Sequence, residues 1–168
     1  MTHVLQSRVQ QAPPPDFDQR LLDDDVAALR LEFEDDAAFR RAVVERFREA
    51  LAEGRAEITA DFERDHGGLA CARRLAALED EIVRSIYAYV VRFVYPLERP
   101  SSAERLCVAA VGGYGRATLA PGSDIDLLFL LPYKQTPWGE SVVEAMLYVL
   151  WDLRQKVGYS TRSVDECI

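Results

Sequence analysis

A glycine-rich segment, Val111-Gly112-Gly113-Tyr114-Gly115-Arg116, separates two apolar runs and is followed closely by a pair of aspartates. The pair, Asp124 and Asp126, opens the second apolar run, which extends from Ile125 to Leu131. A strand directs side chains at i and i+2 to the same face, so a strand here points both carboxylates the same way. Two carboxylates side by side repel each other, and a bound cation relieves that repulsion. The segment therefore predicts a metal site at the start of a strand.

The glycine-rich segment adds a second property to this site. Small residues let backbone N–H groups approach a phosphate closely, so a metal–nucleotide site is expected. The alternative interpretation is that Asp124 and Asp126 are solvated turn residues and that Ser123 is an ordinary cap. For an isolated Asp-x-Asp that alternative is favoured, but the attached glycine turn and apolar strand reverse the preference.

Composition limits the class of protein. The chain has 168 residues, 49% of them hydrophobic and 29% charged, which is typical of one globular domain with a core. No apolar run approaches the roughly 20 residues that span a bilayer, and residues 1–11 lack the apolar region of a secretory signal. Cytoplasmic residence without a membrane partner is therefore expected. The net charge of −8 leaves no basic surface, which argues against a nucleic-acid partner.

The first hundred residues predict a tail and then helices. Residues 1–16 are polar and proline-rich and are expected to be a disordered tail, and residues 17–100 to be an N-terminal helical region. Asp23-Asp24-Asp25 predicts either the cap of a short helix through Phe33 or a solvated acidic run. Gly54 is expected to weaken or interrupt the next helix. Two longer helices, from about residue 36 and from about 69 to 95, are indicated by apolar residues at helical spacing: Phe39, Val43, Phe47 and Leu51, then Leu75, Leu78, Ile82, Ile86, Val90 and Phe93.

From Leu106 onward the pattern changes to short apolar runs typical of strands. A buried strand is expected over 106–111, one helical turn over 117–120, and a second strand over 125–131. An amphipathic helix over 139–156, ended by Gly158, precedes a third strand over 159–164. The predicted fold class is α+β, with N-terminal helices followed by a small mixed sheet in residues 101–168, incomplete at the C-terminus.

This constellation resembles the nucleotidyltransferase superfamily that includes DNA polymerase beta, in which a Gly-Gly or Gly-Ser turn precedes Asp-x-Asp on a strand. A closer resemblance is to the N-terminal catalytic domain of bacterial PII-protein uridylyltransferase/uridylyl-removing enzymes. That family reads Gly-Gly-Tyr-Gly-Arg, then Leu-x-Pro, then Ser-Asp-Ile-Asp-Leu-Leu. The matching residues here are 112–116, 119–121 and 123–128, and a second matching stretch covers 150–153, 156–160, 162–163 and 166–167.

The resemblance covers most of residues 36–168, with departures. Ala117-Thr118 stands where the family usually has Gly-Glu, and Tyr159 replaces a common His. The family's full enzyme is several times longer. It continues into a metal-dependent HD domain that removes the uridylyl group and two ACT domains that respond to glutamine. The resemblance therefore implies that this chain is a truncated N-terminal fragment, without the glutamine-sensing parts.

The resemblance implies a polymerase-beta-like sheet and a Mg²⁺-dependent transfer of UMP from UTP to a tyrosine hydroxyl of the PII signalling protein, with release of pyrophosphate. Asp124 and Asp126 are the expected catalytic residues and the ligands of Mg²⁺. Gly112 and Gly113 are expected to bind the nucleotide phosphates through backbone N–H groups. Arg116 adds a charged contact, unless it forms a surface salt bridge, and Ser123 adds a hydroxyl donor.

Several points stay open at the level of sequence. A third carboxylate is common in the superfamily, and both Asp165 and a residue beyond Ile168 are candidates. No residue specifies uracil over adenine. The alternatives are a nucleotidyltransferase with a different acceptor, a nucleotide-binding regulatory module without turnover, and a glycosyltransferase, which the upstream glycine turn fits poorly.

Overall fold

The computed structural model describes residues 19–99, 101–133 and 135–167. It confirms the α+β class, with three helices followed by a small mixed sheet and a fourth helix inserted before the last strand. The predicted tail, residues 1–16, lies outside the described residues, and the division at residue 100 stays a prediction. In chain order the elements are α1 (Gln19–Glu32), α2 (Asp36–Asp65), α3 (Gly68–Tyr89), η1 (Val90–Val94), β1 (Cys107–Ala110), η2 (Tyr114–Arg116), β2 (Ile125–Leu131), α4 (Pro137–Asp152), β3 (Val157–Ser163) and η3 (Asp165–Cys167).

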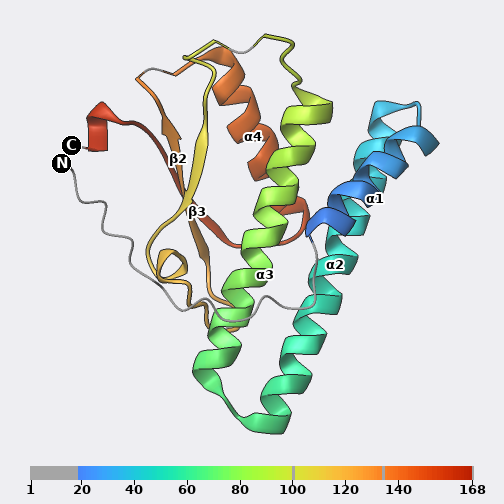
Figure 1. Ribbon diagram of the computed structural model, residues 1–168, viewed down its shortest axis with the longest axis vertical. Helices are drawn as coiled ribbons and strands as arrows, with labels where there is room; N and C mark the ends of the chain where they lie inside the picture. Colours follow the sequence, from blue (N-terminus) through green and yellow to red (C-terminus); the bar gives the residue numbers. More distant parts are fainter. Residues whose placement is uncertain (1–18, 100, 134, 168) are drawn as a thin grey trace, which may run out of the picture.

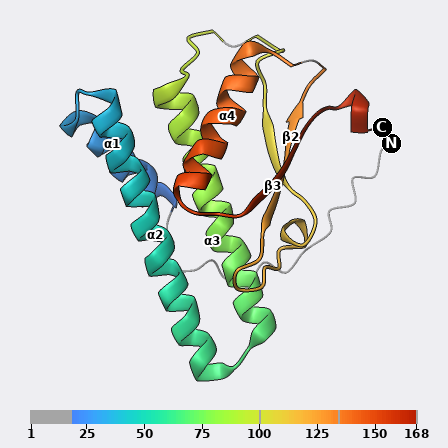
Figure 2. The same ribbon diagram turned by 180° about the vertical axis from the view of Figure 1, so that it is seen from behind.

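The sheet has the strand order β1-β2-β3. β1 pairs antiparallel with β2, and β2 pairs parallel with β3, so α4 is the crossover that a parallel pair requires. In this register Ala110 lies opposite Leu127, and Asp126 lies opposite Gly158. Figures 1 and 2 show α3 and α4 against one side of the sheet, with α1 and α2 beyond them.

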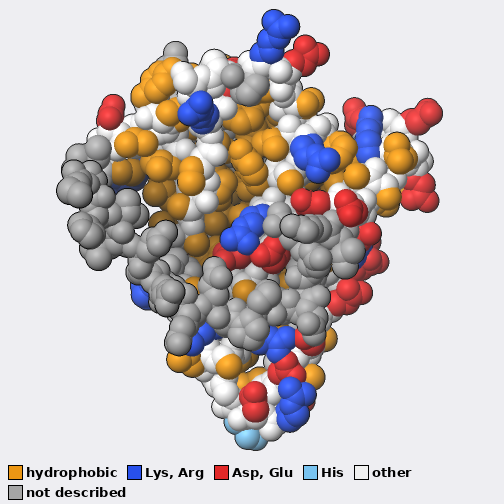
Figure 3. Space-filling model, in the orientation of Figure 1, with side chains coloured by type: hydrophobic (Ala, Val, Ile, Leu, Met, Phe, Trp, Pro, Cys, Tyr) orange, Lys and Arg blue, Asp and Glu red, His pale blue; other side chains and the backbone are white. Residues whose placement is uncertain are grey.

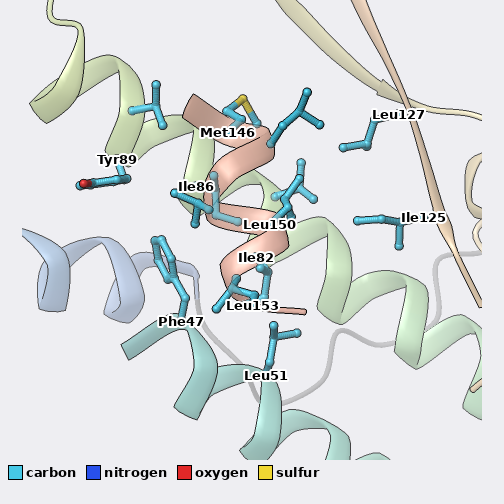
Figure 4. Close-up of a cluster of buried hydrophobic side chains, with 14 of the residues drawn as sticks. Phe47, Leu51, Ile82, Ile86, Tyr89, Ile125, Leu127, Met146, Leu150 and Leu153 are labelled. Atoms are coloured by element: carbon cyan, nitrogen blue, oxygen red, sulfur yellow. The ribbon is translucent and has the colours of Figure 1, made fainter. Parts of the chain in front are cut away.

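The hydrophobic core lies between the sheet and these helices. β2 alternates buried and half-buried residues, and its fully buried positions face the helices. Figure 4 shows Ile125 and Leu127 of β2 beside Met146 and Leu150 of α4, with side chains of α2 and α3 completing the cluster. The other face of β2 carries Asp126 and two half-buried leucines. The central strand therefore holds the core on one face and the candidate site on the other.

The surface has an apolar part and a charged part. In the view of Figure 3, hydrophobic side chains gather where the strands and α4 lie, whereas charged side chains gather over α1 and the lower ends of α2 and α3. Among the described residues, no helix combines the length and the apolarity that crossing a bilayer requires.

The two long helices begin and end for local reasons. The Asp35 side chain accepts bonds from the backbone N–H groups of Ala37 and Ala38, which makes it the N-cap of α2. His66 ends the helix in a left-handed conformation, with φ of 54°. The predicted interruption at Gly54 was wrong, because α2 continues through it and Leu78 of α3 packs directly against the glycine. Gly54 therefore serves close helix packing.

Three further local predictions were wrong. Asp23-Asp24-Asp25 lies inside α1 and caps nothing; Asp25 instead accepts a hydrogen bond of 2.8 Å from Arg46 of α2. The helical turn lies at Tyr114–Arg116 and not over 117–120, since Ala117 has a left-handed φ of 55°. β1 is only partly buried, because it is an edge strand that pairs with β2 alone among the described strands.

Replacing Gly54 by alanine is expected to lower the free energy of unfolding by about 1 kcal/mol. Alanine raises helix propensity by about 1 kcal/mol, but overpacking costs about 1–3 kcal/mol. The added Cβ would lie 2.6 Å from Cδ1 of Leu78. Urea unfolding measures the change. In a Leu78→Ala background the clash is absent, so there Gly54→Ala should stabilise the protein; equal destabilisation in both backgrounds would contradict this packing role.

Candidate functional site

The glycine turn and the aspartate pair meet at one end of the sheet. The turn follows β1 directly, and the pair stands at the beginning of the adjacent β2. The backbone N–H of Val111 donates to the carbonyl oxygen of Asp126 at 3.0 Å, which extends the antiparallel ladder one residue past β1. This bond holds the first residues of the glycine turn beside the start of β2.

The carboxylate of Asp126 lies in a narrow space between two glycines. Gly112, with a φ of +61°, flanks one side, and Gly158, opposite Asp126 in β3, flanks the other. A Cβ added at Gly112 would lie 2.6 Å from Oδ2 of Asp126, and one added at Gly158 would lie closer still to Oδ1. A side chain at either position would force the carboxylate to move. Both glycines therefore define where Asp126 points.

The Asp126 carboxylate is half-buried and has no hydrogen-bond or ion-pair partner among the described residues. A partly buried charge without a partner is costly, and a cation is one group that would satisfy it. Asp124 is exposed, likewise unpartnered within the described ranges, and lies two residues earlier, just before β2 begins. The donor set fits Mg²⁺, which proteins commonly hold with one or two carboxylates plus substrate phosphates.

Asp165, the candidate third carboxylate, does not lie at this end of the sheet. Asp165 follows β3, next to Val164, whose N–H donates to the carbonyl oxygen of Leu131 at the far end of β2. Asp126 and Leu131 are five residues apart on one strand, roughly 17 Å. The candidacy of Asp165 as a third ligand was therefore wrong. Among the described residues no group of three or more potential metal ligands occurs.

The glycine turn is fixed to α3 at two points. The buried Tyr114 donates its hydroxyl hydrogen to Oδ1 of Asp80 at 2.7 Å, and the N–H of Leu119 donates to the carbonyl of Ala72 at 3.0 Å. Within the turn, Gly115 lies so close to β1 that a Cβ there would be 2.6 Å from the carbonyl oxygen of Ala110. Burial, and then the Asp80 charge, raise the pKa of Tyr114 far above its ordinary value of 10.

Replacing Tyr114 by phenylalanine is expected to lower the free energy of unfolding by about 2 kcal/mol at pH 7, because a hydrogen bond to a carboxylate contributes about 1.5–3 kcal/mol. Since folding raises the pKa of Tyr114, the folded chain keeps the proton that the unfolded chain loses above pH 10. The stabilisation is therefore complete below pH 10 and is lost as the pH rises further.

Urea unfolding between pH 7 and pH 11 checks this. The difference between wild type and Tyr114→Phe should narrow above pH 10. Tyr159→Phe, which removes an exposed hydroxyl from β3, should unfold like wild type at pH 7. A pH-independent difference for Tyr114→Phe would rule out the anchoring bond.

Three other residues were predicted to bind the nucleotide, namely Gly113, Arg116 and Ser123. Gly113 lies next to Arg116, because a Cβ at Gly113 would be 3.8 Å from a guanidinium nitrogen of that arginine. Arg116 is exposed, and no ion pair to it occurs among the described residues, so the salt-bridge alternative is not observed. Ser123 is exposed and lines a separate cavity on the helical side of the sheet. The structure thus brings Gly112 next to Asp126 and Gly113 next to Arg116, whereas Ser123 lines the cavity and shows no contact with either pair among the described residues.

Two features were missed from the sequence. Gly158 was expected to end a helix, but α4 ends at Asp152, and Gly158 lies in β3 beside Asp126. The bond between Tyr114 and Asp80 joins residues 34 positions apart. The only sequence signal for Gly158 was its place in the second family-like stretch, and Asp80 gave none.

Neither a family model nor a solved structure matches the chain. A protein of Rhodopseudomonas palustris is 53% identical over 133 residues, which are 79% of this chain and 14% of that protein. A protein of a Bradyrhizobium strain is 50% identical over 155 residues, which are 92% of this chain and 17% of that protein. Both are named bifunctional uridylyltransferase/uridylyl-removing enzyme, which confirms the family resemblance. The chain spans less than a fifth of the length of these curated relatives.

Proposed function

We propose that this chain, which is homologous to part of the bifunctional uridylyltransferase/uridylyl-removing enzymes, carries a nucleotidyltransferase site that moves UMP from UTP to a tyrosine hydroxyl of the PII signalling protein. The observation that supports the chemistry most strongly is the unpartnered Asp126 carboxylate, held between Gly112 and Gly158 beside a glycine turn. The nucleotide and the acceptor are taken from the family resemblance.

Each part of the site has a role in this proposal. Asp124 and Asp126 hold Mg²⁺, which when bound neutralises charge on the phosphate oxygens and lowers the pKa of the attacking hydroxyl. Backbone N–H groups of Gly112 and Gly113 bind the phosphates, and the exposed Arg116 adds a charge-assisted contact. The two glycines flanking Asp126 keep its carboxylate oriented before substrate binds.

The proposed transfer exchanges one phosphorus–oxygen bond for another and involves no redox step. The tyrosine oxygen forms a bond to the α-phosphorus of UTP, and the bond from that phosphorus to the β-phosphate bridging oxygen breaks. Pyrophosphate leaves with the bonding electrons, and the hydroxyl proton passes to solvent or to a base. Transition-state charge accumulates on oxygens around the α-phosphorus, where Arg116, and a metal that Asp124 and Asp126 would hold, would stabilise it.

The direct test is incubation of the chain with Mg²⁺, PII protein and UTP labelled at the α-phosphate. Transfer of the label to PII supports the proposal. The label should be absent when EDTA is added, and absent when the acceptor tyrosine of PII is replaced by phenylalanine. UTP binding without transfer to PII would favour the regulatory module. Transfer to PII that persists without any divalent metal would contradict the assigned chemistry.

A further inference from the structure

A cavity of about 260 Å³ lies on the helical side of the sheet, so it does not share the face that carries Asp126. Its walls come from α2, α3, the loop that leads into β2 and the loop that leads into β3. Ile125, whose side chain faces the helices, forms part of the floor. The cavity is therefore built by four segments that the fold brings together, and neither Asp124 nor Asp126 is among its lining residues.

The charged groups that line the cavity are mainly basic. Arg55, Arg154 and Lys156 line it against one carboxylate, that of Glu79. Arg154 and Lys156 have no side-chain hydrogen bond or ion pair among the described residues. A local excess of positive charge in a chain of net charge −8 favours an anionic guest. Arginine and lysine side chains without partners are the groups that bind a carboxylate or phosphate.

The cavity also holds buried polar atoms that lack partners. The Glu79 residue is 4% exposed; its Oε1 accepts a bond of 2.7 Å from Arg55, whereas its Oε2 has no partner among the described residues. Arg55 also donates to Oε1 of Gln155 at 3.1 Å, and the buried Nε2 of that amide is likewise unpartnered in the described part. Buried polar groups are normally satisfied. Oε2 of Glu79 as an acceptor and Nε2 of Gln155 as a donor are therefore available to a ligand.

Arg154 adds a conformational observation. It has a left-handed φ of 58°, which a residue with a side chain adopts at a cost. That strained position lies in the loop that brings Arg154, Gln155 and Lys156 to the cavity wall. Apolar side chains complete the lining, namely Ile58, Leu75, Leu119 and Ile125.

We propose that this cavity binds a small organic anion that carries a carboxylate together with a hydroxyl or amino group. The carboxylate pairs with Arg154 and Lys156, and the hydroxyl or amino hydrogen is donated to Oε2 of Glu79. The apolar lining contacts the carbon chain. A volume of about 260 Å³ is near the lower end of ligand cavities, which selects molecules of about four to six carbons.

Binding of defined probes to the whole chain tests this by isothermal titration calorimetry. L-malate, L-aspartate and 3-hydroxybutyrate each carry a carboxylate and a donor, and succinate and butyrate lack the donor. We expect at least one of the first three to bind with a Kd below roughly 1 mM, as a few good polar contacts would give. Its Kd should be at least about tenfold lower than that of the matched probe without the donor, which is succinate for L-malate and L-aspartate and butyrate for 3-hydroxybutyrate. If none of the three binds at a probe concentration of about 10 mM, which is tenfold above the expected Kd, the proposal is overturned.

Variants locate the site. Lys156→Met and Arg154→Asn, the latter chosen because asparagine tolerates the left-handed conformation, should each weaken binding about tenfold. Arg73→Met, which removes an exposed arginine of α3 outside the cavity lining, is the matched control and should bind like wild type. Equal weakening by all three variants would indicate a general charge effect and contradict the site.

A chemical readout inside the molecule gives a second check. The half-buried Cys71 lines the cavity, whereas Cys107 and Cys167 are exposed elsewhere. The bound anion should slow iodoacetamide labelling of Cys71 while leaving the other two cysteines unchanged, as measured by mass spectrometry of the peptides. Unchanged labelling of Cys71 at a saturating anion concentration would contradict binding in this cavity. Asp126→Asn, on the opposite face, should leave both binding and protection intact, which separates this proposal from the nucleotidyltransferase function.

Discussion

Replacing Asp126 by asparagine is expected to lower Mg²⁺-dependent UMP transfer by at least about 1,000-fold, because a metal ligand supplies several kcal/mol to the transition state and each 1.36 kcal/mol is a factor of ten. Asn keeps the shape of the side chain between Gly112 and Gly158, so the loss measures charge and not packing. Initial rates of label transfer, with Mg²⁺ varied, measure the effect.

The matched control for this variant is Asp165→Asn. Asp165 is acidic like Asp126, but it is exposed and follows β3 at the far end of the sheet. Its replacement should leave the rate within about twofold, since a surface charge this distant is largely screened. The free energy of unfolding of Asp126→Asn should not fall, because an unpartnered, half-buried charge is removed. Comparable loss of activity in both variants would contradict the assignment of Asp126.

Replacing Gly112 by alanine is expected to lower transfer by about 100-fold or more, through displacement of the Asp126 carboxylate. A shift of about 1 Å in a catalytic group costs about that factor. The added Cβ would lie 2.6 Å from Oδ2 of Asp126, so either the turn or the carboxylate must move. Transfer rate and Mg²⁺ dependence should both change, with a higher Mg²⁺ concentration needed for half-maximal rate.

Gly122 provides the control for backbone strain at Gly112. Both glycines have a positive φ, +61° at Gly112 and +76° at Gly122, so alanine costs about 1 kcal/mol of stability at each position. A Cβ at Gly122 meets nothing within 4 Å. Gly122→Ala should therefore lose similar stability but keep its activity. Loss of activity in both variants to the same extent would show that strain, and not the position of Asp126, limits the rate.

The local patterns of the sequence predicted much of this fold. Apolar spacing located α2, α3 and β2, and the glycine turn next to an aspartate pair located the candidate site. The role of those residues stays a prediction that no comparison tests. Helices and strands of single segments can be predicted from the sequence because helix and strand periods are local properties of the chain.

What the sequence did not predict depends on contacts between distant segments. Gly158 meets Asp126 only because β3 pairs parallel with β2 after the α4 crossover, and no local pattern encodes that register. Gly54 reads as a helix breaker by propensity, yet Leu78 of a neighbouring helix explains its presence. In both cases the glycine serves a close approach that only tertiary structure reveals.

The proposed function requires the carboxylates of Asp124 and Asp126 to bind a divalent metal beside the glycine turn. Anomalous diffraction from crystals of the chain with Mn²⁺ and a non-hydrolysable UTP analogue tests it most directly. We expect a metal peak about 2.1 Å from an oxygen of Asp126, with the triphosphate against Gly112 and Gly113. A metal bound elsewhere, or an analogue held away from the glycine turn with Asp126 uncoordinated, would contradict it.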